Sequence, residues 1–464
     1  MNEKYKHLLN FAANLITILF EALVYGYVWY MMYVPYLSQS DRFFRRGNWA
    51  VIGIYVLFIF FFTNSFGGYK IAYMRIRDIV LSHYLAIFLS GILAYLEICL
   101  IFNDYVILQP IIGMMIVECL FVMPWIILVR KLYQKLYPPD QMLVIYGDYP
   151  PDDLINKINT RKDSYNICAK VSVKVGYVEL FKLIDQYNAV VLCDIHSQER
   201  NQIMKYCYEQ SVRTYVTQKI SDILFRGAED IHLFDTPLLV SRNQGPTITQ
   251  LFFKRIMDIV LSLIGCVLAS PFMLIIAIAI KLYDGGPVIY KQERITRNGE
   301  KFMMYKFRSM SMDSEKEGAR LAAKGDKRIT PVGRIIRNIH FDELPQIINI
   351  LKGDMSIVGP RPEREVIAKQ YEEIIPEFVL RLKVKAGLTG YAQVYGKYNT
   401  TPYDKLKMDI TYIENYSIWL DIRILLLTFK ILFQRENTEG VDESQVTAIK
   451  TFDDIEGKSK HHSD

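Results

Sequence analysis

Residues 254–281 read KRIMDIVLSLIGCVLASPFMLIIAIAIK, an apolar run with cations at both ends and a Ser270-Pro271 pair in its middle. The run exceeds the roughly 20 apolar residues that a helix needs to cross a bilayer core. Proline removes a backbone donor and clashes with the preceding turn, so it favours a kink or a break at this point. The run therefore predicts a membrane-embedded helix that either spans with a kink or turns back at Ser270-Pro271.

Four further apolar runs lie upstream, and each is long enough to span a bilayer as a helix. They occupy residues 11–36, 49–69, 79–102 and 105–129. Basic residues precede the first run, separate the second from the third and follow the fourth, although the first loop also carries arginines. Because cations favour the cytoplasmic side, both ends of this segment are predicted to be cytoplasmic. Residues 1–136 are therefore predicted to form a domain of four transmembrane helices.

The number of crossings constrains the fifth run. After four crossings the chain is back in the cytoplasm, so a fifth crossing would place all later residues outside the cell. Lys254, Arg255 and Lys281 flank the run at both ends, which favours the cytoplasmic side for both. We therefore expect residues 254–282 to form a re-entrant helix with its break at Ser270 and Pro271, and a kinked spanning helix is the alternative.

Residues 137–245 have a different texture. Short β-rich stretches at 142–146, 166–171, 189–193, 212–216 and 237–240 alternate with helical periodicity at 152–158, 178–186, 199–209 and 220–225. Such alternation predicts βαβ units and a Rossmann-like parallel sheet. The first strand leads into GDYPP at 147–151, which lacks the glycines of a G-x-G-x-x-G nucleotide loop. We expect a structural or regulatory module, with a bound nucleotide as the alternative.

Composition excludes several classes of protein. The chain has 464 residues, of which 51% are hydrophobic and 22% charged, and its net charge is +6. A disordered or fibrous protein has fewer large apolar residues, and a mild basic excess suits a membrane surface or phosphate-bearing substrates. The six cysteines form no C-x-x-C pair, which indicates a reducing compartment. Residues 435–464 are polar and are predicted to be a disordered tail.

Two adjacent acids, Asp342 and Glu343, stand out in the segment RNIHFDELPQ at 337–346. Proline is tolerated in the first turn of a helix, so Pro345 places both acids at or near a helix N-terminus. An ionised carboxylate there can serve as a nucleophile, a metal ligand or both. Capping acids without any chemistry are the alternative.

A further motif, after the two acids in the chain, strengthens the interpretation that this region carries out chemistry. Two prolines in GPRPE, residues 359–363, stiffen the loop around Arg361, whose planar guanidinium matches phosphate oxygens. Further cations precede this loop in the chain: Lys306, Arg308 and Arg337. Phosphoryl transfer mainly requires positioning and neutralisation of negative charge. Several cations with one or two carboxylates that hold Mg²⁺ are the expected set of groups.

Residues 254–433 resemble the bacterial sugar transferase domain of the monotopic phosphoglycosyl transferases, which are polyprenyl-phosphate hexose-1-phosphate transferases. The preceding four spans and sheet module resemble the large subclass of that family. The matching motifs, in chain order, are KR at 254–255 with Asp258, SP at 270–271, GP at 286–287, KFRSM at 306–310, DELPQ at 342–346, GDMS at 353–356, GPRPE at 359–363, GLTG at 387–390 and AQV at 392–394.

The resemblance implies a mainly helical catalytic domain over residues 246–434 and a reaction. A UDP-sugar donates sugar 1-phosphate to polyprenyl (undecaprenyl) phosphate, which releases UMP and begins a capsule, exopolysaccharide or O-antigen. By motif position, Asp342 resembles the nucleophile and a ligand of Mg²⁺ (or Mn²⁺), and Glu343 resembles its partner in metal binding and proton handling. The remaining predicted substrate-binding residues are Lys306, Arg308, Arg337, Arg361 and Glu363. General-base action by Asp342, with direct attack by the lipid phosphate, is the alternative.

The resemblance also implies a location and partners. We expect a multi-pass protein of the bacterial cytoplasmic membrane, with its catalytic domain on the cytoplasmic face, a homodimer and no nucleic-acid partner. A non-enzymatic membrane scaffold or nucleotide sensor is the competing hypothesis. The chain departs from the family pattern at Thr296, where glycine is frequent, at Ala386, where proline is frequent, and at His340-Phe341.

Overall fold

The computed structural model describes residues 4–37, 45–241, 245–311, 328–396 and 400–433. The chain divides into two compact units, Met1–Gln218 and Lys219–Asp464. The predicted polar tail at 435–464 lies outside the described residues.

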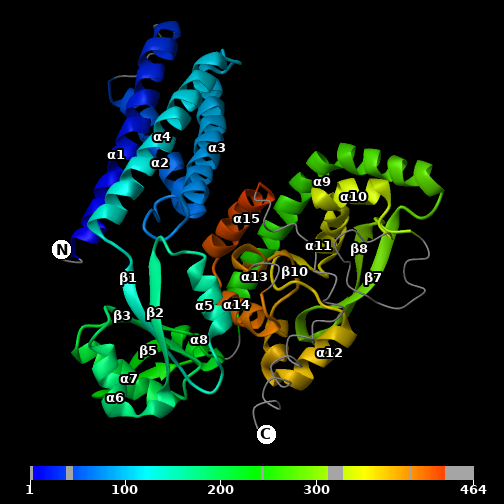
Figure 1. Cartoon of the computed structure of the whole chain (residues 1–464). Helices are drawn as coiled ribbons and strands as arrows, with labels where there is room; N and C mark the ends of the chain where they lie inside the picture. Colours follow the sequence, from blue (N-terminus) through cyan, green and yellow to red (C-terminus); the bar gives the residue numbers. More distant parts are fainter. Residues whose placement is uncertain (1–3, 38–44, 242–244, 312–327, 397–399, 434–464) are drawn as a thin grey trace. The chain divides into compact units, whose positions relative to one another are not determined.

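The first unit begins with four long apolar helices that lie side by side (Figure 1). α1 packs on α2 and α4, and α3 packs on the same two helices. Each is long and apolar enough to cross a membrane, which agrees with the four upstream runs. Inside the bundle, the Tyr55 hydroxyl of α2 donates to both carboxylate oxygens of Glu118 in α4, at 2.9 and 2.8 Å. The elements are α1 (Lys4–Val28), which continues as a π turn (Trp29–Tyr33) and a 3-10 turn (Val34–Tyr36), α2 (Arg45–Phe66), α3 (Ile76–Phe102) and α4 (Gln109–Leu136).

A four-stranded parallel sheet completes the first unit and confirms the predicted parallel arrangement. Its strand order is β2-β1-β3-β4. After β1, a Cβ on Gly147 would lie 2.2 Å from the Asp194 carbonyl oxygen, so the chain itself fills the space beside this glycine. The elements are β1 (Asp140–Tyr146), α5 (Asp152–Asn159), β2 (Tyr165–Ser172), a 3-10 turn (Val173–Val175), α6 (Tyr177–Ile184), β3 (Ala189–Cys193), α7 (Ser197–Glu209) and β4 (Arg213–Val216).

The fifth strand predicted for this sheet does not belong to it, so that prediction is wrong. Strand β6 (Thr236–Val240) pairs antiparallel with β5 (Glu229–Leu233) as a separate hairpin in the second unit. The reason is the short connection, because a parallel partner needs a crossover of about a dozen residues. Helix α8 (Ile220–Arg226) also belongs to the second unit, where Ile220 and Ile223 are buried in a cluster with Leu406 and Ile410.

The second unit is built around the long helix α9 (Ile248–Asp284) and the antiparallel hairpin β7–β8. Short β9 and β10 pair in parallel, and a buried core that includes Met304, Val358 and Ile424 joins them to β8 and α15. The elements after α9 are β7 (Ile289–Ile295), a 3-10 turn (Arg297–Gly299), β8 (Lys301–Phe307), α10 (Pro331–Asn338), the 3-10 turn η5 (Phe341–Glu343), α11 (Gln346–Lys352), β9 (Ser356–Val358), α12 (Glu365–Ile374), the 3-10 helix η6 (Pro376–Lys383), β10 (Gly387–Thr389), α13 (Tyr391–Tyr395), α14 (Pro402–Glu414) and α15 (Ile418–Leu432).

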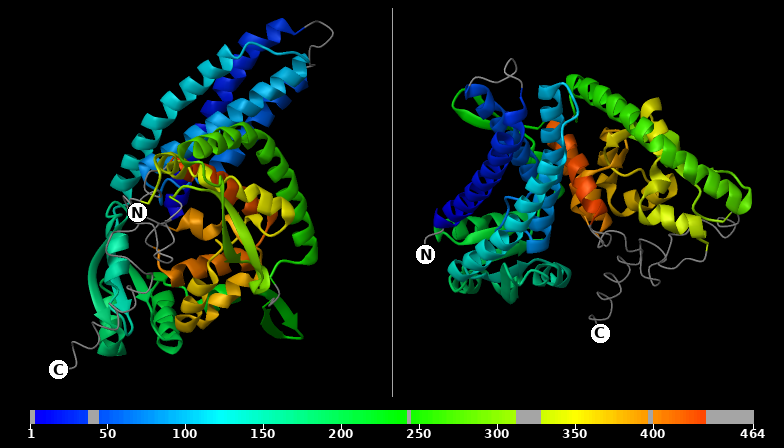
Figure 2. Two further views of the ribbon diagram at one scale, coloured as in Figure 1. Left: turned by 90° about the vertical axis from the view of Figure 1, so that its right-hand side faces the viewer. Right: turned by 90° about the horizontal axis from the view of Figure 1, so that it is seen from above.

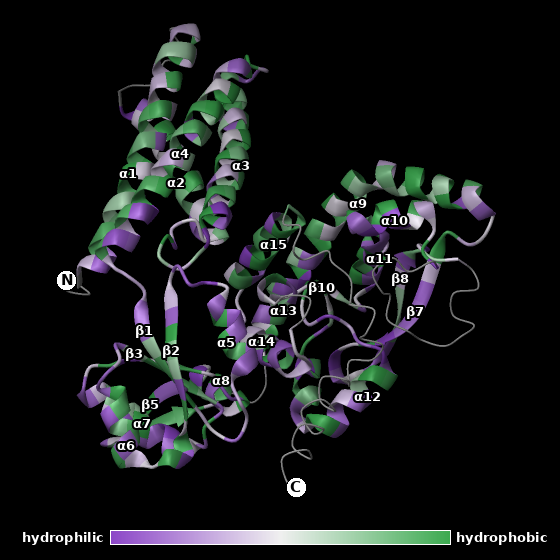
Figure 3. Ribbon diagram, viewed as in Figure 1, coloured by the Kyte–Doolittle hydropathy of each residue, from purple (hydrophilic) through white to green (hydrophobic). Residues whose placement is uncertain are grey.

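Helix α9 runs without interruption through Pro271, so the secondary structure shows no break at Ser270 and Pro271, contrary to the prediction. Pro271 itself has no amide hydrogen to donate to the Val267 carbonyl oxygen. The Ser270 hydroxyl donates to the Val267 carbonyl oxygen at 2.8 Å. The ribbon of α9 is curved in Figure 1 and in the left view of Figure 2. Proline inside a helix is a common cause of such bending. Between its two ends the helix exposes apolar side chains, among them Leu268 and Ile275. The hydropathy colouring marks most of the α9 ribbon as hydrophobic (Figure 3).

Both ends of α9 attach to other elements of the second unit. Near the N-terminal end, Lys254 forms an ion pair with Asp421 of α15 at 2.7 Å. Near the C-terminal end, Ile280 lies in a buried cluster with Phe307 and Ile336. The exposed middle of α9 therefore lies between two ends that are both packed on the second unit.

Candidate active site

Asp342 and Glu343 lie in the 3-10 turn η5, directly before Pro345 and helix α11. His340 lies between α10 and this turn, and its positive φ of 58° is a left-handed conformation. The placement agrees with the prediction that both acids stand just before a helix.

The Glu343 carboxylate is held by two cations that come from distant parts of the chain. Its Oε1 accepts from Lys306 Nζ of β8 at 2.7 Å and from Arg361 Nη2 at 3.1 Å. Burial alone would raise the pKa of Glu343, but Arg361 and Lys306 outweigh it and hold this pKa well below its usual range. Glu343 is therefore ionised at neutral pH and fixes two cations beside Asp342.

Asp342 has the opposite electrostatic environment. In the described part of the chain, no ion pair involves its carboxylate. Its pKa is raised, first by burial and then by the negative charge of Glu343, while Lys306 and Arg337 act in the other direction. A carboxylate that is only partly buried and not neutralised by a direct cation contact is available to react or to bind a cation.

The loop that carries Arg361 is fixed by a close approach of two backbones. The Gly359 amide donates to the Thr389 carbonyl oxygen at 2.9 Å, and the Gly387 amide donates to that of Pro360 at 2.9 Å. A Cβ on Gly387 would lie 2.1 Å from the Gly359 nitrogen, so any side chain would push the two segments apart. The loop therefore presents the half-exposed Arg361 side chain from a backbone with little freedom.

The other predicted site residues lie at different distances from the acids. Arg337 makes no ion pair with them within the described ranges, although its charge contributes to the pKa of Asp342. Arg308 forms an ion pair with Asp284 at the end of α9. Glu363 lies 3.9 Å from Arg294 and from Arg381. The structure therefore brings Lys306, Glu343 and Arg361 into direct contact, with Asp342 adjacent in sequence.

Sequence reasoning missed a set of buried polar contacts that position this site. Asp258 of α9 accepts from the Ser356 hydroxyl at 2.8 Å and from the Ile357 amide at 3.0 Å, which fixes β9 ahead of the Arg361 loop. Lys254 was treated as a flanking cation, yet it is buried against Asp421. A signal existed, since Lys254, Asp258 and Ser262 form one polar stripe with i, i+4 spacing in an otherwise apolar helix.

Two departures from the family pattern meet in space. The Ala386 amide donates to Thr296 Oγ1 at 3.1 Å, and the Thr296 hydroxyl donates to the Asp354 carbonyl oxygen at 3.1 Å. Proline at 386 would have no amide hydrogen to donate, and glycine at 296 would have no hydroxyl to receive it. Thr296 and Ala386 therefore form a matched pair beside the Arg361 loop.

Comparison with known proteins identifies the family. Residues 249–435 match the family described as bacterial sugar transferase. A UDP-glucose:undecaprenyl-phosphate glucose-1-phosphate transferase of Caulobacter vibrioides is 38% identical over 209 residues, which are 44% of this chain and 78% of that protein. The chain belongs to the bacterial sugar transferase family.

Two longer relatives match over more of the chain. A UDP-N-acetylgalactosamine-undecaprenyl-phosphate N-acetylgalactosaminephosphotransferase of Aeromonas hydrophila is 38% identical over 254 residues, which cover 53% of this chain and 59% of the relative. A UDP-glucose:undecaprenyl-phosphate glucose-1-phosphate transferase of Klebsiella pneumoniae is 32% identical over 322 residues, which cover 68% of this chain and 64% of the relative. Each match thus covers less than two thirds of the relative's own length.

Proposed function

We propose that this membrane protein transfers sugar 1-phosphate from a UDP-sugar to polyprenyl phosphate, of which undecaprenyl phosphate is the expected form. The products are UMP and a polyprenyl-diphospho-sugar, the first lipid-linked intermediate of a capsule, exopolysaccharide or O-antigen. The names of the relatives support the substrate classes. The observation that carries the proposal is the contrast between two adjacent acids, Glu343 bound by two cations and Asp342 bound by none in the described chain.

In the proposed mechanism the Asp342 carboxylate attacks the donor phosphorus that bears the sugar. The bond from this phosphorus to the bridging oxygen breaks, and UMP leaves with that oxygen and its electron pair. A phosphate oxygen of the lipid then attacks the same phosphorus and displaces the Asp342 carboxylate, which regenerates the enzyme. Lys306 and Arg361 neutralise the phosphoryl oxygens, and a covalent intermediate lets the water-soluble donor and the lipid react in turn.

The two acids also fit a divalent cation. Magnesium is usually bound through one or two carboxylates together with substrate phosphates, and manganese prefers similar oxygen ligands. Both cation contacts of Glu343 are made to Oε1, so Oε2 and the Asp342 carboxylate are the oxygens that would hold the ion. When bound, Mg²⁺ or Mn²⁺ supplies charge neutralisation for the donor diphosphate.

Membrane placement is part of the same proposal. We propose four transmembrane helices, α1 to α4, and a re-entrant α9 with its bend at Ser270-Pro271. Attachment of both ends of α9 to the second unit supports this topology, because a spanning helix would place its ends on opposite sides of a hydrocarbon core about 30 Å thick. Basic residues at the ends of the upstream runs favour the cytoplasmic face for the active site. The phosphate of a membrane lipid is then within reach of Asp342.

A transfer assay with labelled UDP-sugars and polyprenyl phosphate tests the proposal. Asp342→Asn should lower turnover by about 10³-fold or more, since it removes the nucleophile but keeps the side-chain volume. The matched control is Glu373→Gln, which neutralises an exposed acid of α12 and should leave turnover unchanged. Full activity of Asp342→Asn would overturn the proposed function.

A further inference from the structure

The Arg361 loop is held through its carbonyl groups. Two of its residues are prolines, which have no amide hydrogen, so the loop has few donors of its own. Four consecutive carbonyl oxygens each accept a hydrogen bond from outside the loop. The four bonds are Gly387 N to Pro360 O at 2.9 Å, Arg381 Nη2 to Arg361 O at 2.9 Å, Arg294 Nη1 to Pro362 O at 3.3 Å and Ile295 N to Glu363 O at 3.1 Å.

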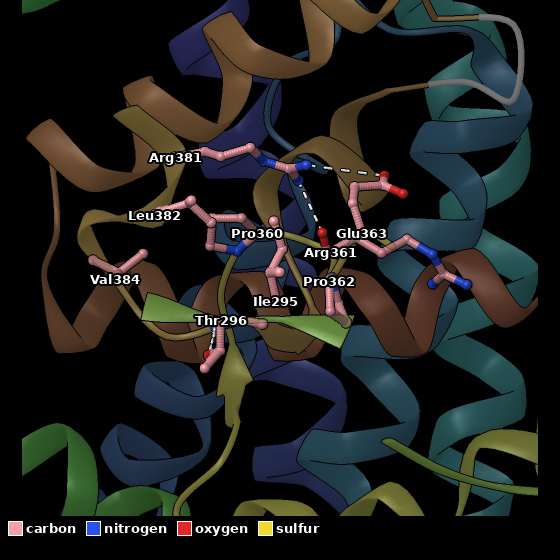
Figure 4. A pocket seen from close by; sticks show the side chains of 10 residues that line it. Ile295, Thr296, Pro360, Arg361, Pro362, Glu363, Arg381, Leu382 and Val384 are labelled. Carbon is pink, nitrogen blue, oxygen red and sulfur yellow. Dashed lines mark hydrogen bonds and ion pairs between the residues drawn. The ribbon is translucent and has the colours of Figure 1, made fainter. Parts of the chain in front are cut away.

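Arg381 makes the bond to the carbonyl of Arg361 itself. Its side chain is 7% exposed, and Nη2 also lies 2.8 Å from Oδ2 of the buried Asp409 in α14. Nη1 lies 3.9 Å from Glu363, and Figure 4 shows the Arg381 guanidinium between Glu363 and the Arg361 carbonyl. The guanidinium carbon lies 4.8 Å from the centre of the Phe378 ring. Charge, burial and aromatic contact together fix the orientation of this guanidinium.

Arginine is suited to this position for a physical reason. Its planar guanidinium presents several donors at fixed angles, so one group can face Asp409 and the Arg361 carbonyl together. A lysine ammonium is a single point charge on a flexible chain and does not fix both directions. Burial raises the pKa of Asp409 to about 6, and Arg381 opposes this rise because its positive charge favours the ionised carboxylate.

We propose that Arg381 is a positioning residue for Arg361. By holding the Arg361 carbonyl, Arg381 sets where the Arg361 side chain leaves the loop, and so keeps its guanidinium on Glu343 and beside the transferred phosphoryl group. Asp409 acts on Arg361 only indirectly, because it fixes the orientation of Arg381. The inference rests on the proposed function only in that Arg361 contacts the donor phosphate.

Two variants separate positioning from folding. Arg381→Lys keeps a positive charge beside Asp409, and so keeps the ion pair, but loses the directed bond to the Arg361 carbonyl. The double variant Arg381→Gln with Asp409→Asn removes both charges at once, which avoids an unpaired buried charge. Lys369→Gln is the control, because this exposed lysine of α12 pairs only with Glu365 among the described residues.

Each variant is measured in the full chain and again in an Arg361→Ala background. Displacement of a substrate-binding group by about 1 Å can cost about 100-fold, so we expect kcat/KM for the UDP-sugar to fall about 10- to 100-fold in the first background. In the Arg361→Ala background the same change should cost less than about threefold, since the group it positions is gone. KM for the UDP-sugar should rise, whereas a smaller folded fraction would lower the apparent kcat alone.

Equal losses in both backgrounds, or full activity of both variants with Arg361 present, would overturn the inference. These results differ from failure of the proposed function, in which Asp342→Asn and Arg361→Ala would themselves remain active. The control Lys369→Gln should change kcat/KM by less than about twofold in either background.

Discussion

Two lysine–carboxylate pairs of the second unit have the same separation but different surroundings. Lys306 lies 2.7 Å from Glu343, and Lys254 lies 2.7 Å from Asp421. The Lys254–Asp421 pair is enclosed, with a side-chain exposure of 8% and 0%, and the Tyr412 hydroxyl donates to the second Asp421 oxygen at 2.8 Å. The Lys306–Glu343 pair is partly accessible and has Asp342 beside it.

The comparison shows that the distance between opposite charges does not identify an active site. Both Asp421 oxygens accept a hydrogen bond, one from Lys254 and one from the Tyr412 hydroxyl, so this cluster holds α9, α14 and α15 together. At the Glu343 cluster, the Asp342 carboxylate has no ion pair among the described residues. Chemistry is therefore expected at the cluster whose charges the fold does not fully pair.

The largest expected effect is the loss of stability after disruption of the enclosed pair. Asp421→Asn leaves Lys254 buried without a counter-charge, which should reduce the free energy of unfolding by about 3–5 kcal/mol. Replacement of both partners, Lys254→Met with Asp421→Leu, should recover most of this loss, because a buried ion pair can be exchanged for apolar side chains at little cost. Thermal unfolding in detergent measures both, and an equal loss in the double variant would contradict the structural role.

The next effect concerns the accessible pair. Glu343→Gln removes the carboxylate that forms ion pairs with both Lys306 and Arg361. It should therefore reduce kcat by about 100-fold. It also removes the negative charge that raises the pKa of Asp342, so the acidic limb of the pH–rate profile should move to lower pH. A shift to higher pH would contradict the assigned electrostatics.

The same residue gives the stability of the unit a pH dependence of known sign. The pKa of Glu343 is lowered in the folded state, so its contribution is present above the unfolded-state pKa of about 4.3 and is lost as the pH falls below that value. Acid unfolding should therefore be less steep in Glu343→Gln than in the parent chain. Equal acid sensitivity of the two proteins would argue against the ion pairs with Lys306 and Arg361.

The smallest expected effect tests the matched pair beside the Arg361 loop. Ala386→Pro removes the amide that donates to Thr296, and should lower the free energy of unfolding by about 1 kcal/mol. Adding Thr296→Gly removes the orphaned acceptor, so the double variant should lose less than the sum of the two single changes. Strict additivity in unfolding measurements would show that the two positions are independent.

Much of the architecture could be predicted because it is encoded in local periodicity. The four upstream apolar runs predicted helices α1 to α4. The alternation of strands and helices predicted the four strands that form the parallel sheet. The predicted pairing of the fifth strand was wrong. Its sequence indicates an extended conformation only, whereas the two-residue connection to β5 makes the two strands a hairpin. Pairing partners are not local, so periodicity did not reveal them.

The site shows the same division between local and distant information. Asp342, Glu343 and the proline-flanked Arg361 could be proposed from the sequence because each motif is contiguous in the chain. Arg381 was missed because its partners, Arg361 and Asp409, lie 20 and 28 residues away and only the fold brings them together. Arg308 was predicted with the phosphate-binding cations by its place in the chain, yet the fold pairs it with Asp284.

The most direct test of the central claim is the intact mass of the protein after mixing with a UDP-sugar in the absence of lipid. UDP-glucose, UDP-galactose and UDP-N-acetylgalactosamine form a suitable panel. We predict an adduct with the mass of one sugar phosphate, an equal amount of UMP, and neither product with Asp342→Asn. If every donor that supports transfer left the mass unchanged, and UMP appeared only after polyprenyl phosphate was added, Asp342 would not be the nucleophile.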